Sequence, residues 1–359
     1  MPHACCHRGD GLRTRQMVLL GILIALACVL PSAAVADEAD EPAHVGLGES
    51  LVREAAEYGW RNWVRQRVLR PADDERFGLT LDEGWQKRDS ALPIVVLVHG
   101  FNSTPQRNDA VLEPIREAGF PCAGFSYPND HSLGESAARL SRALKDLAAT
   151  NAERRVVLVT HSMGGLVARA CVEDPALDPG NVSRLIQIAP PTHGTLLAHA
   201  AVATDVWEHW LGRNAGGAWT RWRDSVVDGL GEAADDLVPG SQFLTALNAR
   251  PRNPQVSYSI LLGTAATVSE GEMDWLRTAV SKTGGRMPGL RTAPGKPGKI
   301  LSGMGEMGEG KGDGVVAVKR GRLEGVDDVT VLAFGHLTCT GGECEDGDCV
   351  RREVLARVQ

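Results

Sequence analysis

One stretch, residues 155–169, constrains the fold of this chain more than any other. It opens with a β-branched and aliphatic run at 156–159, which is typical of a buried parallel strand. A short turn that carries Ser162 follows at once, and an apolar stretch of helical composition comes after it. A serine at the tip of such a strand–turn–helix unit stands above the edge of a sheet on a strained backbone, the arrangement known as a nucleophile elbow. The stretch therefore predicts Ser162 as a candidate nucleophile.

Small residues around this turn decide how closely the predicted helix can pack on the strand. Gly164 and Gly165 meet this need, whereas Thr160 stands where the usual elbow pattern has its first glycine. The alternative interpretation is a buried strand–helix turn that carries a serine by chance. The choice between the two depends on whether the rest of the chain supplies the partners that a nucleophile needs.

A second apolar strand is predicted at 94–98, and it runs directly into His99 and Gly100. Gly100 lets the backbone turn so that the amide of Phe101 can face a substrate oxygen, and the amide of Met163 would be the second donor. Two fixed N–H groups favour a tetrahedral transition state, because negative charge develops on that oxygen only there. We expect His99 to orient this loop rather than to take part in the chemistry.

Strands and helices alternate along the chain from the strand at 94–98 onward. This alternation predicts an α/β fold with a mostly parallel central sheet and helices on both faces. Residues 71–92 are polar and irregular, and residues 282–312, rich in Gly, Lys and Pro, predict a mobile loop. Besides the segments named above, we predict helices at 108–119 and 133–149 and strands at 122–128, 183–189, 257–263 and 328–334.

An acid and a histidine follow the elbow in the chain order that a triad on such a sheet requires. Asp313 lies in an Asp-Gly-Val-Val segment, and His336 follows the strand predicted at 328–334. In the order Ser162, Asp313, His336, the histidine would accept the serine proton and the carboxylate would hold the histidine tautomer. The chain thus supplies the partners that the elbow needs.

Other acids and histidines are weaker candidates, because they do not lie at a strand end in the required chain order. His193 follows a predicted strand but precedes Asp313, so we expect it to line or brace the site, as we do for His99, Gly100 and His161. The remaining candidates lie on predicted helices or away from strand ends: His131, His199, His209, Asp228, Asp235, Asp236 and Asp274.

Taken together, these segments resemble the lipase-type α/β-hydrolases, close to bacterial triacylglycerol lipases and the GPI inositol-deacylase-like group. The resemblance spans residues 94 to about 337. It implies ester hydrolysis through a covalent acyl-serine, no cofactor, and secretion. The matching segments are Val98-His99-Gly100-Phe101, Thr160-His161-Ser162-Met163-Gly164-Gly165, Pro191-Thr192-His193-Gly194-Thr195, Asp236-Leu237-Val238-Pro239-Gly240-Ser241, Phe243-Leu244, Leu247-Asn248 and Gly312-Asp313-Gly314-Val315-Val316.

Two features depart from the pattern of these hydrolases. Thr160 replaces a glycine, and Leu337-Thr338-Cys339 follows His336 where calcium-binding bacterial relatives place an aspartate. We therefore expect no bound metal. Alternatives with the same triad are an esterase for small soluble esters, an acyltransferase, an amidase and a thioesterase. An alternative of another class is a non-catalytic binding protein on the hydrolase fold.

The N-terminus has the pattern of an export signal. Residues 1–36 combine three arginines with an apolar run at 17–30, too short to span a bilayer comfortably, and end in Ala34-Val35-Ala36. We expect a secreted or periplasmic protein after cleavage, with an uncleaved or lipid-modified membrane anchor as the alternative. An acidic linker and capping helix at 37–92 would then precede a hydrolase domain at 93–359.

A tryptophan-rich segment at 195–240 interrupts the alternation of strands and helices. Its four tryptophans are Trp207, Trp210, Trp219 and Trp222. We expect a helical lid over the site that contacts a lipid surface or an apolar ester substrate. The alternative is a helical hairpin that packs on the core.

Charge and cysteine content narrow the class of protein further. The net charge of −7, without a basic cluster, argues against nucleic-acid binding. Cys122 and Cys171 fall in a predicted strand and helix, where we expect small core residues. Cys339, Cys344 and Cys349 predict at least one disulfide in an oxidising compartment, and a metal site is the weaker interpretation.

Overall fold

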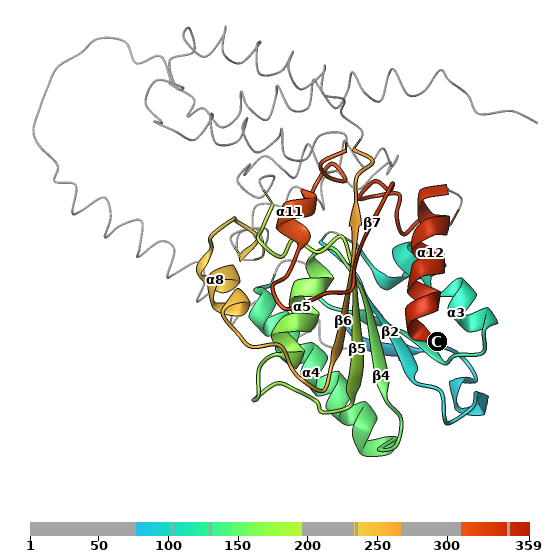
Figure 1. Ribbon diagram of the computed structural model, residues 1–359. Coiled ribbons are helices and arrows are strands. Elements are labelled where there is room, and N and C mark those ends of the chain that lie inside the picture. Colours follow the sequence, from blue (N-terminus) through green and yellow to red (C-terminus); the bar gives the residue numbers. More distant parts are fainter. Residues whose placement is uncertain are drawn as a thin grey trace, which may run out of the picture.

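Seven strands in the described part of the chain form one twisted sheet (Figure 1). The computed structural model describes residues 77–101, 103–128, 131–195, 233, 236–266, 310–342 and 345–359. The strand order is β1-β3-β2-β4-β5-β6-β7, with β1 antiparallel to β3 and every other pair parallel, which confirms the predicted α/β fold. The strands are β1 (Gly78–Leu81), β2 (Ile94–Val98), β3 (Cys122–Ser126), β4 (Val156–His161), β5 (Val182–Ile188), β6 (Ser257–Gly263) and β7 (Val329–Leu332).

Helices cover both faces of this sheet (Figure 1). α4 (Leu133–Thr150) and α5 (Met163–Val172) pack on one face, and α3 (Glu113–Glu117) and α12 (Glu345–Val358) pack on the other. The other described helices are η2 (Trp85–Lys87), η3 (Pro105–Val111), α8 (Gln242–Asn248) and α11 (Val318–Gly321). None of the described helices is long and apolar enough to cross a membrane.

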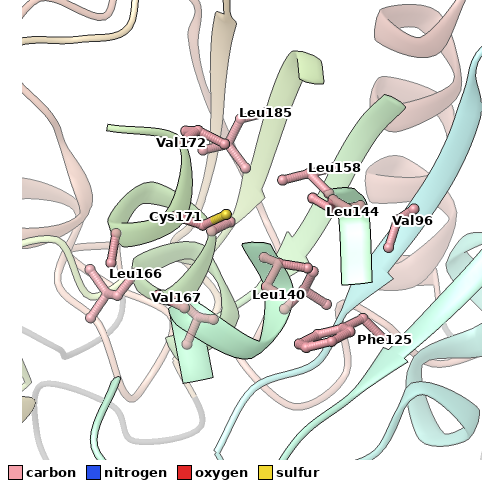
Figure 2. Close-up of a cluster of buried hydrophobic side chains, with 14 of the residues drawn as sticks. Val96, Phe125, Leu140, Leu144, Leu158, Leu166, Val167, Cys171, Val172 and Leu185 are labelled. Carbon is pink, nitrogen blue, oxygen red and sulfur yellow. The ribbon is translucent and has the colours of Figure 1, made fainter. Parts of the chain in front are cut away.

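The larger hydrophobic core lies between the sheet and helices α4 and α5. Figure 2 shows Leu140 and Leu144 of α4, Leu158 of β4 and Cys171 of α5 within this cluster. All four side chains are fully buried, and Cys171 is the small core residue that the sequence predicted. Burial of one such leucine contributes about 1.5–3 kcal/mol, so this cluster anchors the helix that follows Ser162.

The start of α4 shows why this predicted helix forms where it does. The Ser132 side chain accepts a hydrogen bond from the Glu135 backbone N–H at 3.3 Å, which satisfies one of the amides left unpaired at a helix N-terminus. Leu140, Leu144 and Leu147 then recur at helical spacing and are buried. The helix predicted at 133–149 is thus confirmed, and it extends to Thr150.

The helix predicted at 108–119 differs from the structure. Two shorter elements replace it, the 3-10 helix η3 and the α-helix α3. Pro114 stands in the first turn of α3, where its missing N–H costs nothing, but it cannot continue a helix that begins earlier. The break therefore falls at Leu112.

Five of the described elements were not predicted: β1, η2, α8, α11 and α12. β1 lies within the stretch 71–92 that we expected to be irregular, so the sheet begins inside the predicted linker at 37–92. A strand of four residues at a sheet edge, none of them fully buried, carries too little hydrophobic pattern to stand out. α12 was missed because its first turn is acidic, although Val350, Val354 and Val358 repeat every four residues and are buried.

The predicted disulfide near the C-terminus is wrong in this structure. Cys339 and Cys349 are both free thiols. Each thiol instead donates to a backbone carbonyl, Cys339 to His336 at 3.1 Å and Cys349 to Asp346 at 3.0 Å. Among the described residues, no three His, Cys, Asp or Glu side chains gather as metal ligands.

Several predicted segments lie outside the described residues. They are the export signal at 1–36, the part of the linker and capping helix before Phe77, most of the predicted lid at 195–240, the loop at 282–312 before Gly310, and Cys344.

Close packing between the start of α5 and the end of β2 makes Gly164 indispensable. A Cβ added there would lie 2.5 Å from the Val98 carbonyl oxygen and closer still to that of His99. We predict that Gly164→Ala lowers the free energy of unfolding by about 2–4 kcal/mol, because backbone atoms cannot give way as a side chain can. Denaturant unfolding measures this.

Gly134 in the first turn of α4 is the matched control, since a Cβ there meets no atom within 4 Å. Gly134→Ala should be neutral or stabilise the protein by up to about 1 kcal/mol. Equal effects of the two substitutions would show that the packing of α5 on β2 is not as tight as described.

Candidate active site

Ser162 occupies the strained turn between β4 and α5. Its backbone has φ 53° and ψ −125°, and among the described residues only Ala189 is another non-glycine with positive φ. The Ser162 N–H donates to the Ile188 carbonyl of β5 at 2.8 Å, which holds the turn against the sheet. A serine persists in this unfavourable region only where its surroundings over-determine it, and such strain is typical of functional sites.

Thr160 fits beneath the elbow because residue 165 is glycine. The buried Thr160 hydroxyl donates to the Ile186 carbonyl at 3.3 Å. A Cβ added to Gly165 would lie 3.3 Å from that hydroxyl oxygen and 3.1 Å from the Gln187 side-chain oxygen. The departure from the usual elbow pattern is therefore accommodated by a neighbouring residue that offers space.

The structure brings Ser162, His336 and Asp313 into one chain of hydrogen bonds. His336 Nε2 lies 2.9 Å from Ser162 Oγ, and His336 Nδ1 lies 2.8 Å from Asp313 Oδ2. A carboxylate can only accept hydrogen bonds, so His336 Nδ1 carries the proton. His336 Nε2 can therefore accept a hydrogen bond from the Ser162 hydroxyl. The three residues are 7%, 1% and 2% exposed, so this chain lies almost out of contact with solvent.

Asp313 is held by its own loop. Its Oδ1 accepts from the backbone N–H groups of Val315 at 2.9 Å and Val316 at 2.7 Å, which leaves Oδ2 for the histidine. The His336 N–H also donates to the Asp313 carbonyl at 3.0 Å. The Asp-Gly-Val-Val segment thus fixes the carboxylate in direction as well as in place.

His99 fixes the direction of the peptide that follows it. Its Nδ1 donates to the Gly100 carbonyl at 2.8 Å, and because the carbonyl and N–H of a trans peptide point in opposite directions, the Phe101 N–H points away from the His99 ring. The Tyr127 hydroxyl donates to the His99 carbonyl at 2.7 Å, and the two rings stack with centroids 4.3 Å apart. His99 therefore orients this loop, as expected from the sequence.

The loop after β2 lies directly against the elbow. A Cβ added to Gly100 would be 2.9 Å from the Cβ of Ser162, so only glycine allows this approach. On the other side, α5 begins at Met163, whose N–H has no carbonyl to bond within its own helix. The backbone amides of Phe101 and Met163 are thus carried by the two segments that flank Ser162.

Two buried histidines beside the site are held neutral. Burial lowers the pKa of His99 to about 4, and burial together with the nearby His336 lowers the pKa of His161 to about 3. The His161 ring lies 5.0 Å from the His336 ring, and its Nε2 is 3.0 Å from the His336 carbonyl oxygen. Neither histidine therefore adds positive charge to the site near neutral pH.

Comparison with known proteins agrees with the fold. A family model described as the PGAP1-like alpha/beta domain matches residues 129–213. The mature form of the lipase BlEst2 from Bacillus licheniformis superposes with a TM-score of 0.51 at 19% identity, covering 77% of this chain and 97% of that one. The chain has the α/β-hydrolase fold.

The predicted resemblance to lipase-type α/β-hydrolases is therefore confirmed. The propeptide form of the same Bacillus lipase gives a TM-score of 0.52 at 18% identity, with 77% of this chain and 53% of that one covered. A monoacylglycerol lipase from Paleococcus ferrophilus shows a weaker likeness, with a TM-score of 0.41 at 17% identity and coverage of 74% and 95%. Comparison with curated proteins gave no significant match.

The weaker candidate residues that the structure describes make other contacts. The side chain of His193 contacts Asn248 at 3.4 Å. Asp236 accepts from the Leu133 N–H at the start of α4, and His131 pairs with Glu135. His199, His209, Asp228, Asp235 and Asp274 lie outside the described residues.

Sequence reasoning missed two residues that support the site. The Tyr127 hydroxyl donates a hydrogen bond to the His99 carbonyl. The Thr195 hydroxyl donates to the Val315 carbonyl at 2.7 Å and so fixes the loop that carries Asp313. Thr195 belongs to the segment after β5 that matches the lipase-type hydrolases. That match singled out the residue but did not predict its hydrogen bond to Val315. Tyr127 ends a predicted strand, and nothing in its local sequence points to His99.

The two neutral histidines predict how stability depends on pH. An unfolded histidine titrates near 6.5. The stabilisation linked to His99 is complete above that pH and is lost as the pH falls toward about 4, because only the unfolded chain takes up the proton in this window. His99→Asn should reduce the slope of unfolding free energy against pH between 6 and 4.5 by about 1 kcal/mol per pH unit.

Denaturant unfolding at a series of pH values measures this slope. Above about pH 7.5 the slopes for the wild-type protein and for His99→Asn should agree, which serves as the internal control. An unchanged slope below pH 6 would mean that His99 is not held neutral by burial.

Proposed function

We propose that the chain is a secreted serine hydrolase, a lipase or lipase-like esterase that cleaves carboxylic esters through an acyl-serine intermediate. The observation that carries the proposal is the hydrogen-bond chain from Ser162 through His336 to Asp313, at a serine on a strained turn. A serine hydroxyl is a weak nucleophile until an adjacent base accepts its proton, and this chain supplies that base already oriented.

Acylation would begin with attack of Ser162 Oγ on the acyl carbon while its proton passes to His336 Nε2. Asp313 stabilises the imidazolium that forms and keeps Nδ1 protonated. The tetrahedral intermediate then collapses, the bond to the alcohol breaks, and the leaving oxygen takes the proton from Nε2. The products of this half-reaction are a free alcohol and an acyl-serine.

Stabilisation of the oxyanion is assigned to the Phe101 and Met163 backbone N–H groups. Support comes from the His99 hydrogen bond, which directs the Phe101 N–H away from its ring, and from the position of Met163 at the start of α5. One such donor typically changes kcat by about 10²–10³-fold. The helix dipole of α5 adds partial positive charge at the same end.

Deacylation would use the same groups in reverse. His336 takes a proton from water, the hydroxide attacks the acyl carbon, and collapse of the second tetrahedral intermediate releases the carboxylic acid. Nε2 then returns the proton to Ser162 Oγ, so the cycle closes without a cofactor. An acyltransferase would differ only in using an alcohol in place of water, and an amidase or thioesterase only in the leaving group.

A lipid ester is the proposed substrate class, and export the proposed localisation. The similar Bacillus protein is described as a lipase, and the first 36 residues have the pattern of an export signal. The tryptophan-rich segment is proposed to act as a lid that meets a lipid surface. In support, a hydrogen bond of 3.1 Å from the Thr195 N–H to the Leu237 carbonyl links the two ends of this segment. The link lies next to the loop that carries Asp313.

Substitution of the nucleophile and of its distant acid tests the mechanism. Ser162→Ala should lower kcat for p-nitrophenyl ester hydrolysis by roughly 10⁴-fold or more, and Asp313→Asn by roughly 10³–10⁴-fold, with small effects on KM. Ser183→Ala is the control, because Ser183 bonds the Val156 carbonyl at the opposite end of β4. Full activity of Ser162→Ala would refute the assignment.

Rates on monomeric and aggregated esters test the proposed lid. Replacing Trp207, Trp210, Trp219 and Trp222 with serine should lower hydrolysis of emulsified long-chain esters several-fold and leave hydrolysis of a soluble short-chain ester unchanged. The measurement is initial rate below and above the solubility limit. Equal losses on both substrates would favour the alternative, a helical hairpin that packs on the core.

A further inference from the structure

His161 connects the general base to the loop that follows β2. It is the last residue of β4 and is 6% exposed. Its Nε2 lies 3.0 Å from the His336 carbonyl oxygen, and its Nδ1 would lie 3.3 Å from a Cβ added to Gly100. The ring thus bonds the backbone that carries the base and lies beside the loop proposed to carry an oxyanion donor.

The tautomer of His161 follows from these contacts. A carbonyl oxygen can only accept, so Nε2 carries the proton and donates to His336, while Nδ1 keeps its lone pair. Among the described residues, no group hydrogen-bonds this buried Nδ1. An unsatisfied buried acceptor is costly, so core packing alone does not account for a histidine at this position.

The backbone of His336 is held at both of its polar groups. Its N–H donates to the Asp313 carbonyl at 3.0 Å, and its carbonyl accepts from His161 Nε2 and from the Cys339 thiol at 3.1 Å. Since a neutral imidazole N–H is a stronger donor than a thiol, His161 is the main anchor of that carbonyl. From this backbone the imidazole reaches Ser162, with 2.9 Å between His336 Nε2 and Ser162 Oγ.

We propose that His161 is a positioning residue for the hydrolase reaction, which holds the His336 backbone so that the imidazole keeps its reach to Ser162. The proposal rests on the proposed function. Histidine suits the task because burial keeps it uncharged, so that it donates a hydrogen bond without opposing the imidazolium that forms on His336. The other titratable groups near this ring are His99 and, beyond His336, Asp313.

Two substitutions of His161 distinguish loss of its hydrogen-bond donor from a change in side-chain volume. The amide nitrogen of a glutamine can reach the position of a histidine Nε2, whereas a phenylalanine fills the space without donating. We expect His161→Phe to lower kcat for a soluble p-nitrophenyl ester about 10–100-fold with KM changed less than about two-fold, because a shift of the base by about 1 Å has that effect. His161→Gln should retain kcat within about three-fold.

A third variant controls for loss of stability. Cys171→Ala removes a buried side chain from the same segment of the chain, within the core under α5 and away from the base. Its melting temperature should fall while kcat stays unchanged. His161→Asn, whose amide falls short of the carbonyl, should behave like His161→Phe and replaces it if that variant does not fold.

The measurements are kcat, KM, the rate of the acylation burst and the melting temperature of each variant. A slowed burst in His161→Phe that is restored in His161→Gln supports the positioning role. If both variants keep the wild-type burst rate, or both lose stability with kcat unchanged, His161 is only a core residue and the proposal is overturned. A wild-type protein without hydrolysis or burst would instead refute the proposed function itself, and the positioning role with it.

Discussion

Close approach of α5 to the ends of β2 and β4 is the constraint on which the rest of this structure depends. Gly164 and Gly100 permit it, because a Cβ at either would collide with backbone or with Ser162. The approach forces Ser162 into positive φ, and the buried face of α5 supplies the free energy that keeps the turn there. The positions of Ser162 and of the Met163 amide are thereby set by packing between regular elements rather than by a flexible loop.

Parallel strand order then brings distant parts of the chain to the same edge of the sheet. Ser162 follows β4, His99 follows β2, and His336 follows β7, so residues far apart in sequence meet at the carboxyl ends of their strands. The side chains of Ser162, His336 and Asp313 are paired there, the carboxylate of Asp313 with two backbone amides and with His336 Nδ1. Such pairing matters because an unpaired polar group in a site this buried would be costly.

Much of the fold and of the candidate site could be predicted from the sequence, because buried parallel strands and the elbow carry strong local patterns. The strand predicted at 257–263 matches β6 residue for residue, and Ser162, Asp313 and His336 meet as the chain order indicated. β1 and α12 were missed since their hydrophobic patterns are short or masked by acidic residues. Tyr127 was missed because its role depends on a contact 28 residues away in the chain, which no local pattern records.

Reaction with a fluorophosphonate tests the central claim most directly, because this reagent phosphonylates a serine only where a base and an oxyanion hole activate it. Intact-mass measurement and peptide mapping of the purified protein should show one adduct, located on Ser162, and none on the Ser162→Ala variant. A protein that stays unlabelled, or that carries its adduct on another residue, would contradict the account of Ser162 as an activated nucleophile.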